Sequence, residues 1–296
     1  MKISIVVITD KIRPDKLSRL FDSLKPSFVD DNQEILLLCE SDGSNESNNA
    51  LSCPIFSVPV KYIPIPEKQG ISFNRNQGIK HARGDIIVFI DDDCWVQENW
   101  LKSLVAPVLE NKEVVATTGG TKIPPSNFLG DCISALGFPG GGSLGFEKMW
   151  KVSTNGFTNH LAVGNCAIKK NLFSTLGEFD EKMKYGAEDA EFSYRLEKVG
   201  IPIKYEPGAF AYHEARTTLR SFIRWQVRRG KANYHFQKKV DGVGQFVKLR
   251  FWSTKNIIKT NLFNFRFPII FALLIFSFIL QQVGYFQQRF AEKKQK

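Results

Sequence analysis

Short apolar runs alternate with amphipathic segments through the first two thirds of the chain. Runs rich in Ile, Val and Leu are typical of buried strands, and apolar residues three or four positions apart are typical of helices. The pattern predicts strands over residues 3–9, 34–39, 58–65, 86–90, 114–118 and 203–206. It predicts helices over residues 14–24, 72–82, 98–109 and 187–199. This alternation favours an α/β fold with a mostly parallel sheet flanked by helices.

Residues 119–161, here called the 119–161 segment, interrupt this pattern. They are rich in glycine, with Gly140, Gly141 and Gly142 in succession. Such a composition predicts a long, mobile connection. Because long loops in compact domains are usually functional, we expect this segment to act near an active site, for example as a lid.

The strand predicted over residues 86–90 runs directly into three carboxylates, Asp91, Asp92 and Asp93. Open α/β sheets bind ligands at the carboxyl ends of their strands. Three adjacent negative charges repel one another, and a hard divalent cation such as Mg²⁺ or Mn²⁺ would offset that repulsion. If the extended backbone continues, Asp91 and Asp93 point one way and Asp92 points the other. A solvated acidic turn explains the run equally well.

Charge is distributed unevenly along the 296 residues, whose net charge is +10. From Arg216 to the end there are 17 Lys and Arg against 2 Asp and Glu, whereas the preceding residues hold 23 and 28. A mildly acidic region is therefore followed by a strongly basic one. This asymmetry points to nucleic acid or to an anionic membrane surface. We expect no nucleic-acid partner, because the chain contains no nucleic-acid-binding motif.

Residues 267–286 contain no charged side chain. Twenty such residues are about the length that crosses a hydrocarbon core roughly 30 Å thick. An interfacial helix or a buried core helix would show the same composition. The five cysteines are odd in number and lack metal-binding spacing, which indicates reduced thiols in a cytosolic setting. We therefore predict a membrane-associated protein with its α/β domain on the cytoplasmic side.

Four motifs occur in order between about residue 3 and residue 230. The first contains Gly70, Arg75, Asn76 and Gly78 and leads into Asp91, Asp92 and Asp93; the second is Gly164-Asn165; the third contains Gly177, Phe179 and Asp180; the fourth contains Gly186, Glu188, Asp189, Glu191 and Arg195. Together they resemble the family 2 inverting glycosyltransferases, which have the GT-A fold. The resemblance implies transfer of a sugar from a nucleoside-diphosphate sugar to a hydroxyl, assisted by a divalent cation, Mg²⁺ or Mn²⁺.

The resemblance also implies roles for individual acids. Asp93 becomes the direct metal ligand, and Asp91 shares the metal or faces the donor ribose, with Asp92 beside them in the donor site. The catalytic base falls in the Glu188–Asp189 pair, with Asp189 the first candidate. Two acids that simply complement the dipole at a helix start are the alternative. His213, which follows the last predicted strand, completes the metal site in this interpretation.

Thr9, Asp42 and Arg75 are the remaining candidates for donor binding. The first strand of the family usually ends in Pro-Thr-Tyr-Asn, whereas here only Thr9 of that motif is present. Asp42 can accept a hydrogen bond from a pyrimidine imide N–H, which favours UDP as the nucleotide. An Asx turn before Gly43 explains Asp42 equally well. Arg75 is expected to meet the base or the diphosphate.

The basic C-terminal third suggests a further ligand. Arg224, Arg228 and Arg229 fall in a helix expected over residues 216–239. They are candidates to pair with a pyrophosphate, either on the donor or on a lipid-linked acceptor, because guanidinium groups match phosphate geometry. A solvated surface facing lipid is the alternative.

These inferences divide the chain into three parts: a GT-A catalytic domain over 1–215, a basic helical extension over 216–264, and a membrane-associated hydrophobic helix with a basic tail over 265–296. The expected partners are a nucleotide-sugar donor, a glycan or lipid-linked acceptor and an anionic membrane surface. The expected role is cell-surface polysaccharide or glycolipid synthesis, with the acceptor pocket in the 119–161 segment. A sugar nucleotidyltransferase and a non-catalytic membrane-bound scaffold of the same fold are the competing hypotheses.

Overall fold

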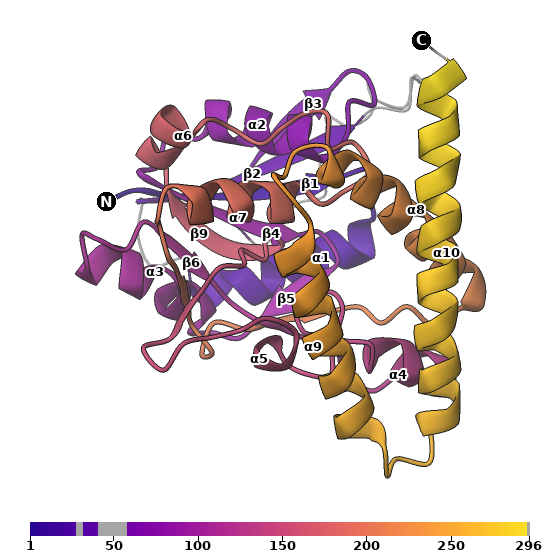
Figure 1. Cartoon of the computed structure of the whole chain (residues 1–296). Coiled ribbons are helices and arrows are strands. Elements are labelled where there is room, and N and C mark those ends of the chain that lie inside the picture. The colour runs from indigo at the N-terminus through magenta and orange to yellow at the C-terminus, as the bar shows by residue number, and fades with distance from the viewer. Residues whose placement is uncertain (28–31, 41–57, 295–296) are drawn as a thin grey trace.

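The computed structural model describes residues 1–27, 32–40 and 58–294 of the chain. Its centre is an eight-stranded sheet with helices on both faces (Figure 1). In spatial order the strands are β3 (Val60–Ile65), β2 (Gln33–Glu40), β1 (Ile3–Thr9), β4 (Ile86–Asp91), β9 (Asn165–Lys169), β6 (Ala116–Thr118), β10 (Ile203–Tyr205) and β8 (Phe157–Thr158). The first four of these strands pair in parallel, whereas β9 is antiparallel to both of its neighbours and β8 is antiparallel to β10. The prediction of a mostly parallel GT-A-like sheet is confirmed.

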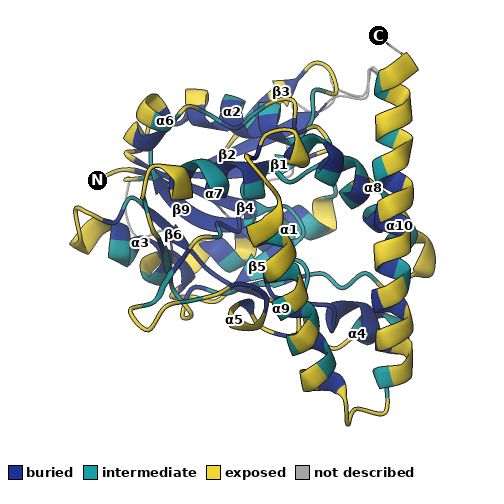
Figure 2. Ribbon diagram, in the orientation of Figure 1, coloured by how far each residue is buried: buried dark blue, intermediate teal, exposed yellow. Residues whose placement is uncertain are grey.

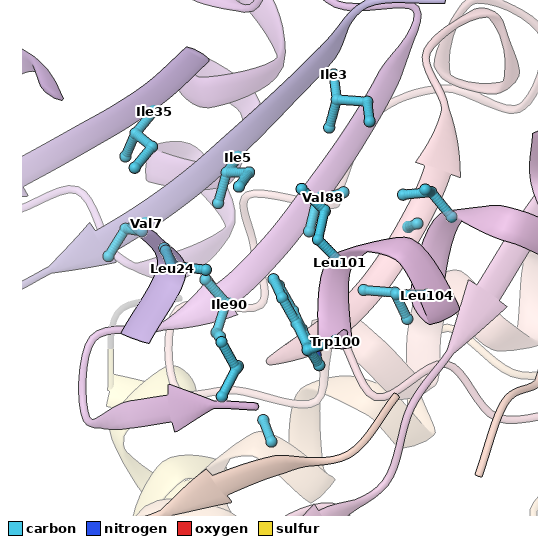
Figure 3. Packing of buried hydrophobic residues seen from close by; sticks show 14 of the residues in the cluster. Ile3, Ile5, Val7, Leu24, Ile35, Val88, Ile90, Trp100, Leu101 and Leu104 are labelled. Atoms are coloured by element: carbon cyan, nitrogen blue, oxygen red, sulfur yellow. The ribbon is translucent and has the colours of Figure 1, made fainter. Parts of the chain in front are cut away.

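The two faces of the sheet bury two separate clusters because side chains alternate along each strand. On one face Ile5 and Val7 of β1 pack beneath helices α1 (Pro14–Leu24) and α3 (Trp100–Glu110), where Trp100 is fully buried (Figure 3). On the other face Val6 packs among residues that include Phe192 of α7 (Glu188–Lys198). Helices α2 (Ile71–His81) and α6 (Asn171–Leu176) also cover this second face. The carboxyl ends of β1 and β4 lie side by side at one edge of the sheet, with Ile8 opposite Asp91.

A second, three-stranded sheet stands beside that edge. It consists of β5 (Cys94–Val96), β11 (Ala211–His213) and β7 (Thr121–Lys122). The register of β11 against β5 places His213 opposite Cys94, one residue after Asp93. These strands were missed from the sequence because two or three residues are too few to show a period. They matter because they bring residue 213 to the end of β4.

The 119–161 segment contains helices and strands that pack into the core, so the prediction of a long, mobile connection was wrong. It contains β7, α4 (Phe128–Ser134), α5 (Phe146–Met149) and β8. Its apolar residues join a third core cluster with residues of the C-terminal helices, for example Trp150 with Phe222 and Leu273. Pattern analysis missed this packing because the partners lie about 70 to 120 positions away in the sequence.

The C-terminal third forms three long helices, α8 (Leu219–Gln237), α9 (Gly244–Asn261) and α10 (Phe267–Lys294). Helix α10 packs along α8 (Figure 1). A Cβ atom at Gly230 would lie 2.0 Å from the carbonyl oxygen of Gln281, and one at Gly284 would lie 2.0 Å from that of Val227. The two helices therefore approach through paired glycines. The division of the chain at residues 215 and 264 stays a prediction.

Candidate active site

The three acids after β4 lie in three different environments. Strand β4 ends at Asp91, and Asp92 and Asp93 form a turn before β5. The alternation expected for a continuing strand therefore does not set the direction of Asp93. Asp91 faces Arg75, Asp92 faces Thr9 and Arg13, and Asp93 faces His213. Each carboxylate thus has its own cationic or hydrogen-bonding partner, which offsets the repulsion among them.

Arg75 of α2 lies between two acids and is almost wholly buried. Its Nη2 atom lies 3.4 Å from Asp91 Oδ1, and its Nη1 atom donates to Glu188 Oε1. Burial lowers the pKa of Arg75, but the Glu188 and Asp91 carboxylates raise it, and the net shift is upward. A Cβ atom at Gly164 would lie 2.2 Å from Asp91 Oδ2. Only glycine at position 164 therefore leaves room for Asp91 in this position.

Thr9 and Asp92 join the ends of β1 and β4. The Thr9 hydroxyl donates to Asp92 Oδ2 at 2.5 Å, and Arg13 Nη2 lies 2.9 Å from the same oxygen. Burial raises the pKa of Asp92 to about 6, although the Thr9 hydrogen bond opposes that shift. Sequence reasoning missed Arg13. Its position just before the first helix, opposite the acids at the strand ends, was the available signal.

Asp93 and His213 form the candidate metal centre. His213 Nε2 lies 3.0 Å from Asp93 Oδ1, and its Nδ1 lies 2.7 Å from the Glu214 carbonyl oxygen. Burial alone would raise the pKa of Asp93, but the neighbouring His213 lowers it by more than burial raises it. The resulting pKa is about 2. In the described part of the chain, the side chains of Asp93, Cys94 and His213 lie close enough together to hold one metal ion. Asp91 is not part of this group.

This donor set fits a divalent cation. Carboxylate oxygen and neutral imidazole nitrogen are both metal ligands, and a backbone carbonyl that accepts from Nδ1–H leaves Nε2 as the ligand atom. The Cys94 thiol does not suit a hard cation. Burial raises its pKa well above the ordinary range, so that it stays protonated.

Glu188 and Asp189 begin α7, as the sequence predicted, but they differ sharply. Glu188 is buried against Arg75, whereas the Asp189 side chain is 36% exposed. Asp189 Oδ1 accepts from the N–H of Ala190 at 2.7 Å, and its Oδ2 lies 4.0 Å from His160 Nε2. Burial raises the pKa of both carboxyls. Of the pair, Asp189 is therefore the acid that an incoming molecule can reach.

His160 is a neighbour of Asp189 that sequence reasoning missed, since nothing around it distinguishes a single histidine. Its ring stacks on Trp150 with centroids 4.2 Å apart and planes 3° apart. Burial lowers its pKa to about 3, so the ring is neutral near neutral pH. Phe146 and Tyr205 continue the stack beyond Trp150. The 119–161 segment thus supplies one wall beside Asp189.

Other motif residues hold the site together. Asn165 accepts a hydrogen bond from the Trp100 indole N–H at 2.9 Å and donates to the carbonyls of Gly120 and Ala209. Asn76 bonds both the N–H and the carbonyl oxygen of Phe179. These side chains fix backbone segments around the acids. Asp42, the candidate for reading the nucleotide base, lies outside the described residues.

Comparison with known proteins agrees with this arrangement. The family model described as glycosyl transferase family 2 matches residues 4–173. Polypeptide N-acetylgalactosaminyltransferase 11 of Xenopus tropicalis is 30% identical over 189 residues, which cover 57% of this chain and 29% of that protein. The hyaluronan synthase of Pasteurella multocida is 29% identical over 168 residues, covering 47% of this chain and 17% of the synthase. The chain thus spans less than a third of the length of these two relatives.

Two solved structures share the fold. The mannosyltransferase PcManGT from Pyrobaculum calidifontis, solved with GDP-Man and Mn²⁺, has a TM-score of 0.59 and 18% identity; the match covers 93% of this chain and 74% of that one. GalNAc-T7, solved with UDP, GalNAc and Mn²⁺, has a TM-score of 0.55 and 15% identity, with 87% and 56% covered. The family match extends over more than half of the chain and includes all three acids after β4. The chain accordingly belongs to glycosyltransferase family 2.

Proposed function

We propose that the protein is a metal-dependent inverting glycosyltransferase that moves a sugar from a nucleoside-diphosphate sugar, with UDP favoured, to a hydroxyl of a glycan or lipid-linked acceptor. The contrast between Glu188 and Asp189 carries this proposal. Two adjacent acids begin one helix, yet Arg75 holds the first in the interior and the second lies open beside His160. That division suits one positioning acid and one general base.

The donor end is assigned to the acids after β4. Asp93 and His213 would hold a divalent cation, Mg²⁺ or Mn²⁺, with Asp91 close to the donor ribose and Asp92 and Thr9 bordering the nucleotide. When bound, the cation supplies positive charge that offsets the charge developing on the leaving diphosphate. The Mn²⁺ and nucleotides in the two structural relatives support this assignment.

The acceptor end is assigned to Asp189. A carboxylate that is partly exposed, with a pKa raised by burial, is suited to take a proton from a hydroxyl near neutral pH. Arg75 donates to Glu188 and opposes the rise that burial causes in its pKa, and so helps to fix the start of α7. Neutral His160, stacked on Trp150, limits where Asp189 Oδ2 can move.

Membrane association at the cytoplasmic face is part of the proposal. Helix α10 is long and apolar enough to cross a membrane, and 39% of its apolar 18-residue stretch is buried inside the protein. Figure 2 shows many exposed residues on this helix, and among them are Phe271, Ile275 and Ile279. A helix with one face packed on α8 and one apolar face exposed is suited to a lipid surface. Synthesis of a cell-surface polysaccharide or glycolipid would use such a location.

A donor panel tests the proposed function. Full-length protein in non-ionic detergent is incubated with UDP-sugars and GDP-sugars, with Mn²⁺ or EDTA, and with a membrane lipid extract as the source of acceptor. We expect UDP release from one or a few UDP-sugars, only with the metal ion, and a product of opposite anomeric configuration by NMR. Release that persists in EDTA, or a product that retains the donor configuration, would contradict the proposal.

A further inference from the structure

Two arginines from different helices converge on one aromatic ring of the 119–161 segment. The Cζ atom of Arg229, on α8, lies 3.9 Å from the centre of the Phe138 ring, and that of Arg250, on α9, lies 5.2 Å from it. Arg229 also lies 5.3 Å from the ring of Trp225. Both arginines are half-buried. The fold therefore holds two cations close together.

Neither guanidinium has an anionic partner within residues 1–27, 32–40 and 58–294. Arg75, Arg13 and Arg195 all pair with carboxylates, whereas the side chains of Arg229 and Arg250 form no ion pair or hydrogen bond there. Burial lowers the pKa of Arg250 to about 10, and burial together with Arg250 lowers that of Arg229. Buried charges in proteins are normally paired. Two half-buried cations without such a partner, side by side, form a site suited to an anion.

The arginine pair lies on the Asp189 side of the site. The carboxylate of Asp189 is near enough to Arg229 to raise its pKa, in opposition to burial. Phe138 packs edge-on against Trp150, the same ring on which His160 stacks beside Asp189. Burial lowers the pKa of Arg216, and Asp93 and Asp91 of the donor end oppose that shift. Arg216 also adjoins the pair, since its Cζ atom lies 4.8 Å from the Trp225 ring that Arg229 contacts. An anion bound at Arg229 and Arg250 would lie on the side of Asp189, the proposed base, and is assigned to the acceptor.

Apolar surface adjoins the same pair. The Arg250 Cζ atom lies 5.6 Å from the centre of the ring of Phe278, a partly exposed residue of α10. Phe251, which follows Arg250 in α9, is 73% exposed. A cavity bounded by both arginines and by Leu274 and Ser277 lies beneath them, with a volume of about 10 Å³, room for a single water. An anion larger than a single water therefore has to bind outside this cavity.

We propose that Arg229 and Arg250 bind the phosphate group of a lipid-linked acceptor, whose hydrocarbon chain lies along the exposed apolar surface near Phe251 and Phe278. Guanidinium groups bind phosphate oxygens through paired, charge-assisted hydrogen bonds. That this phosphate belongs to an acceptor rests on the proposed function. The binding of a phosphate joined to a single alkyl chain does not depend on the proposed function, because it is measured without a sugar donor.

Equilibrium binding to full-length protein in non-ionic detergent tests the inference. The probes are dodecyl phosphate and dodecanol, which differ only in the phosphate, and the signal is tryptophan fluorescence, since Trp225 lies beneath Arg229. We expect dodecyl phosphate to bind at least about tenfold tighter than dodecanol. The double variant Arg229→Gln/Arg250→Gln should reduce that ratio to within about twofold. Arg250→Lys, which keeps the charge without the fork, should lie between them.

Matched controls separate the possible sites. Arg220→Gln removes an exposed arginine from the same helix and should keep the full ratio. The double variant should unfold at the same temperature or higher, because it removes two charges without partners. It should also bind UDP with Mn²⁺ as the unaltered protein does.

Four results would overturn the inference. Equal binding of dodecyl phosphate and dodecanol would remove the phosphate site. An equal loss in Arg220→Gln would indicate a diffuse basic surface, and a parallel loss of UDP binding in the double variant would assign the arginines to the donor. Displacement of dodecyl phosphate by phosphatidylglycerol at equal concentration would assign the site to bilayer phospholipid. A donor panel without turnover leaves the binding result intact, so the two proposals fail separately.

Discussion

Charged side chains at the edge of the sheet have partners of opposite charge, whereas two arginines in the described C-terminal helices have none. At the sheet edge Asp91, Asp92 and Asp93 each have a partner of their own, Arg75, Arg13 or His213. Among the described residues of the helices, Arg229 and Arg250 lie against aromatic rings with no carboxylate bound to them. The charges of the first region are balanced without a ligand. The two arginines of the second region would gain an anionic partner only when a ligand binds. In our account these are the donor end and the acceptor end of one site.

The largest expected effect comes from the acid between the two regions. Asp189→Asn keeps the size of the side chain and removes its ability to take a proton. We expect kcat to fall by about 10²–10⁴ because a positioned general base contributes that much. UDP affinity, measured by calorimetry with Mn²⁺, should stay unchanged. A collapse of UDP affinity would place Asp189 in the donor end, and a larger kcat loss in Glu188→Gln would exchange the roles of the two acids.

The next effect concerns the donor end alone. Asp93→Asn removes one charge from the Asp93–His213 pair, and we expect Mn²⁺-dependent UDP binding to weaken by at least about tenfold. The fold should persist, because Asp93 lies in a turn at the strand end. Circular dichroism checks the fold, and Asp15→Asn, which changes an exposed acid in the first turn of α1, is the control. Unaltered metal-dependent binding in Asp93→Asn would show that the cation lies elsewhere.

The membrane surface tests the helical region without touching its packing. Replacing Phe271, Ile275 and Ile279 of α10 by Gln changes exposed positions only. We expect the unaltered protein to stay in the membrane pellet at high salt, since salt screens charges but not apolar burial. The triple variant should move largely to the supernatant while unfolding at a similar temperature. A full-length protein that needs no detergent to stay in solution would contradict the membrane proposal.

The smallest effect is a shift in the pH profile. Burial and the nearby Asp91 charge raise the pKa of Asp189, while its Ala190 hydrogen bond and Arg75 lower it. The base must be ionised, so kcat/KM should fall as pH drops through this raised pKa, and the acid limb should lie above the ordinary aspartate range near 4. His160→Gln should leave that limb in place, because His160 is neutral throughout this range. Loss of the limb in His160→Gln would assign the titration to the histidine.

The strongest sequence signals concerned the region with paired charges. The apolar run into Asp91 and the acids that start α7 predicted β4, α7 and their ends to within two residues, since local pattern determines such elements. Pairings across the chain could not be predicted. Arg75 with Glu188, and His213 with Asp93 through β5 and β11, depend on how distant segments meet.

The helical region was harder to anticipate for the same reason. Arg250 and Phe138 are 112 positions apart, and no local pattern marks either as part of a site. Glycine in the 119–161 segment suggested an open loop, but the segment's apolar residues find partners in α8, α9 and α10. A shortened chain that ends near Asn264 would expose that shared core. Substitutions on the exposed face of α10 are therefore the better test of membrane binding.

Simultaneous binding tests the two-ended site most directly. The Kd of UDP with Mn²⁺ is measured by calorimetry on full-length protein, first alone and then with saturating dodecyl phosphate. We expect both ligands to bind together, with the UDP Kd unchanged to within about twofold, because separate groups hold each ligand. Competitive displacement of UDP by dodecyl phosphate would show that the paired acids and the unpaired arginines serve a single ligand, and would contradict the account.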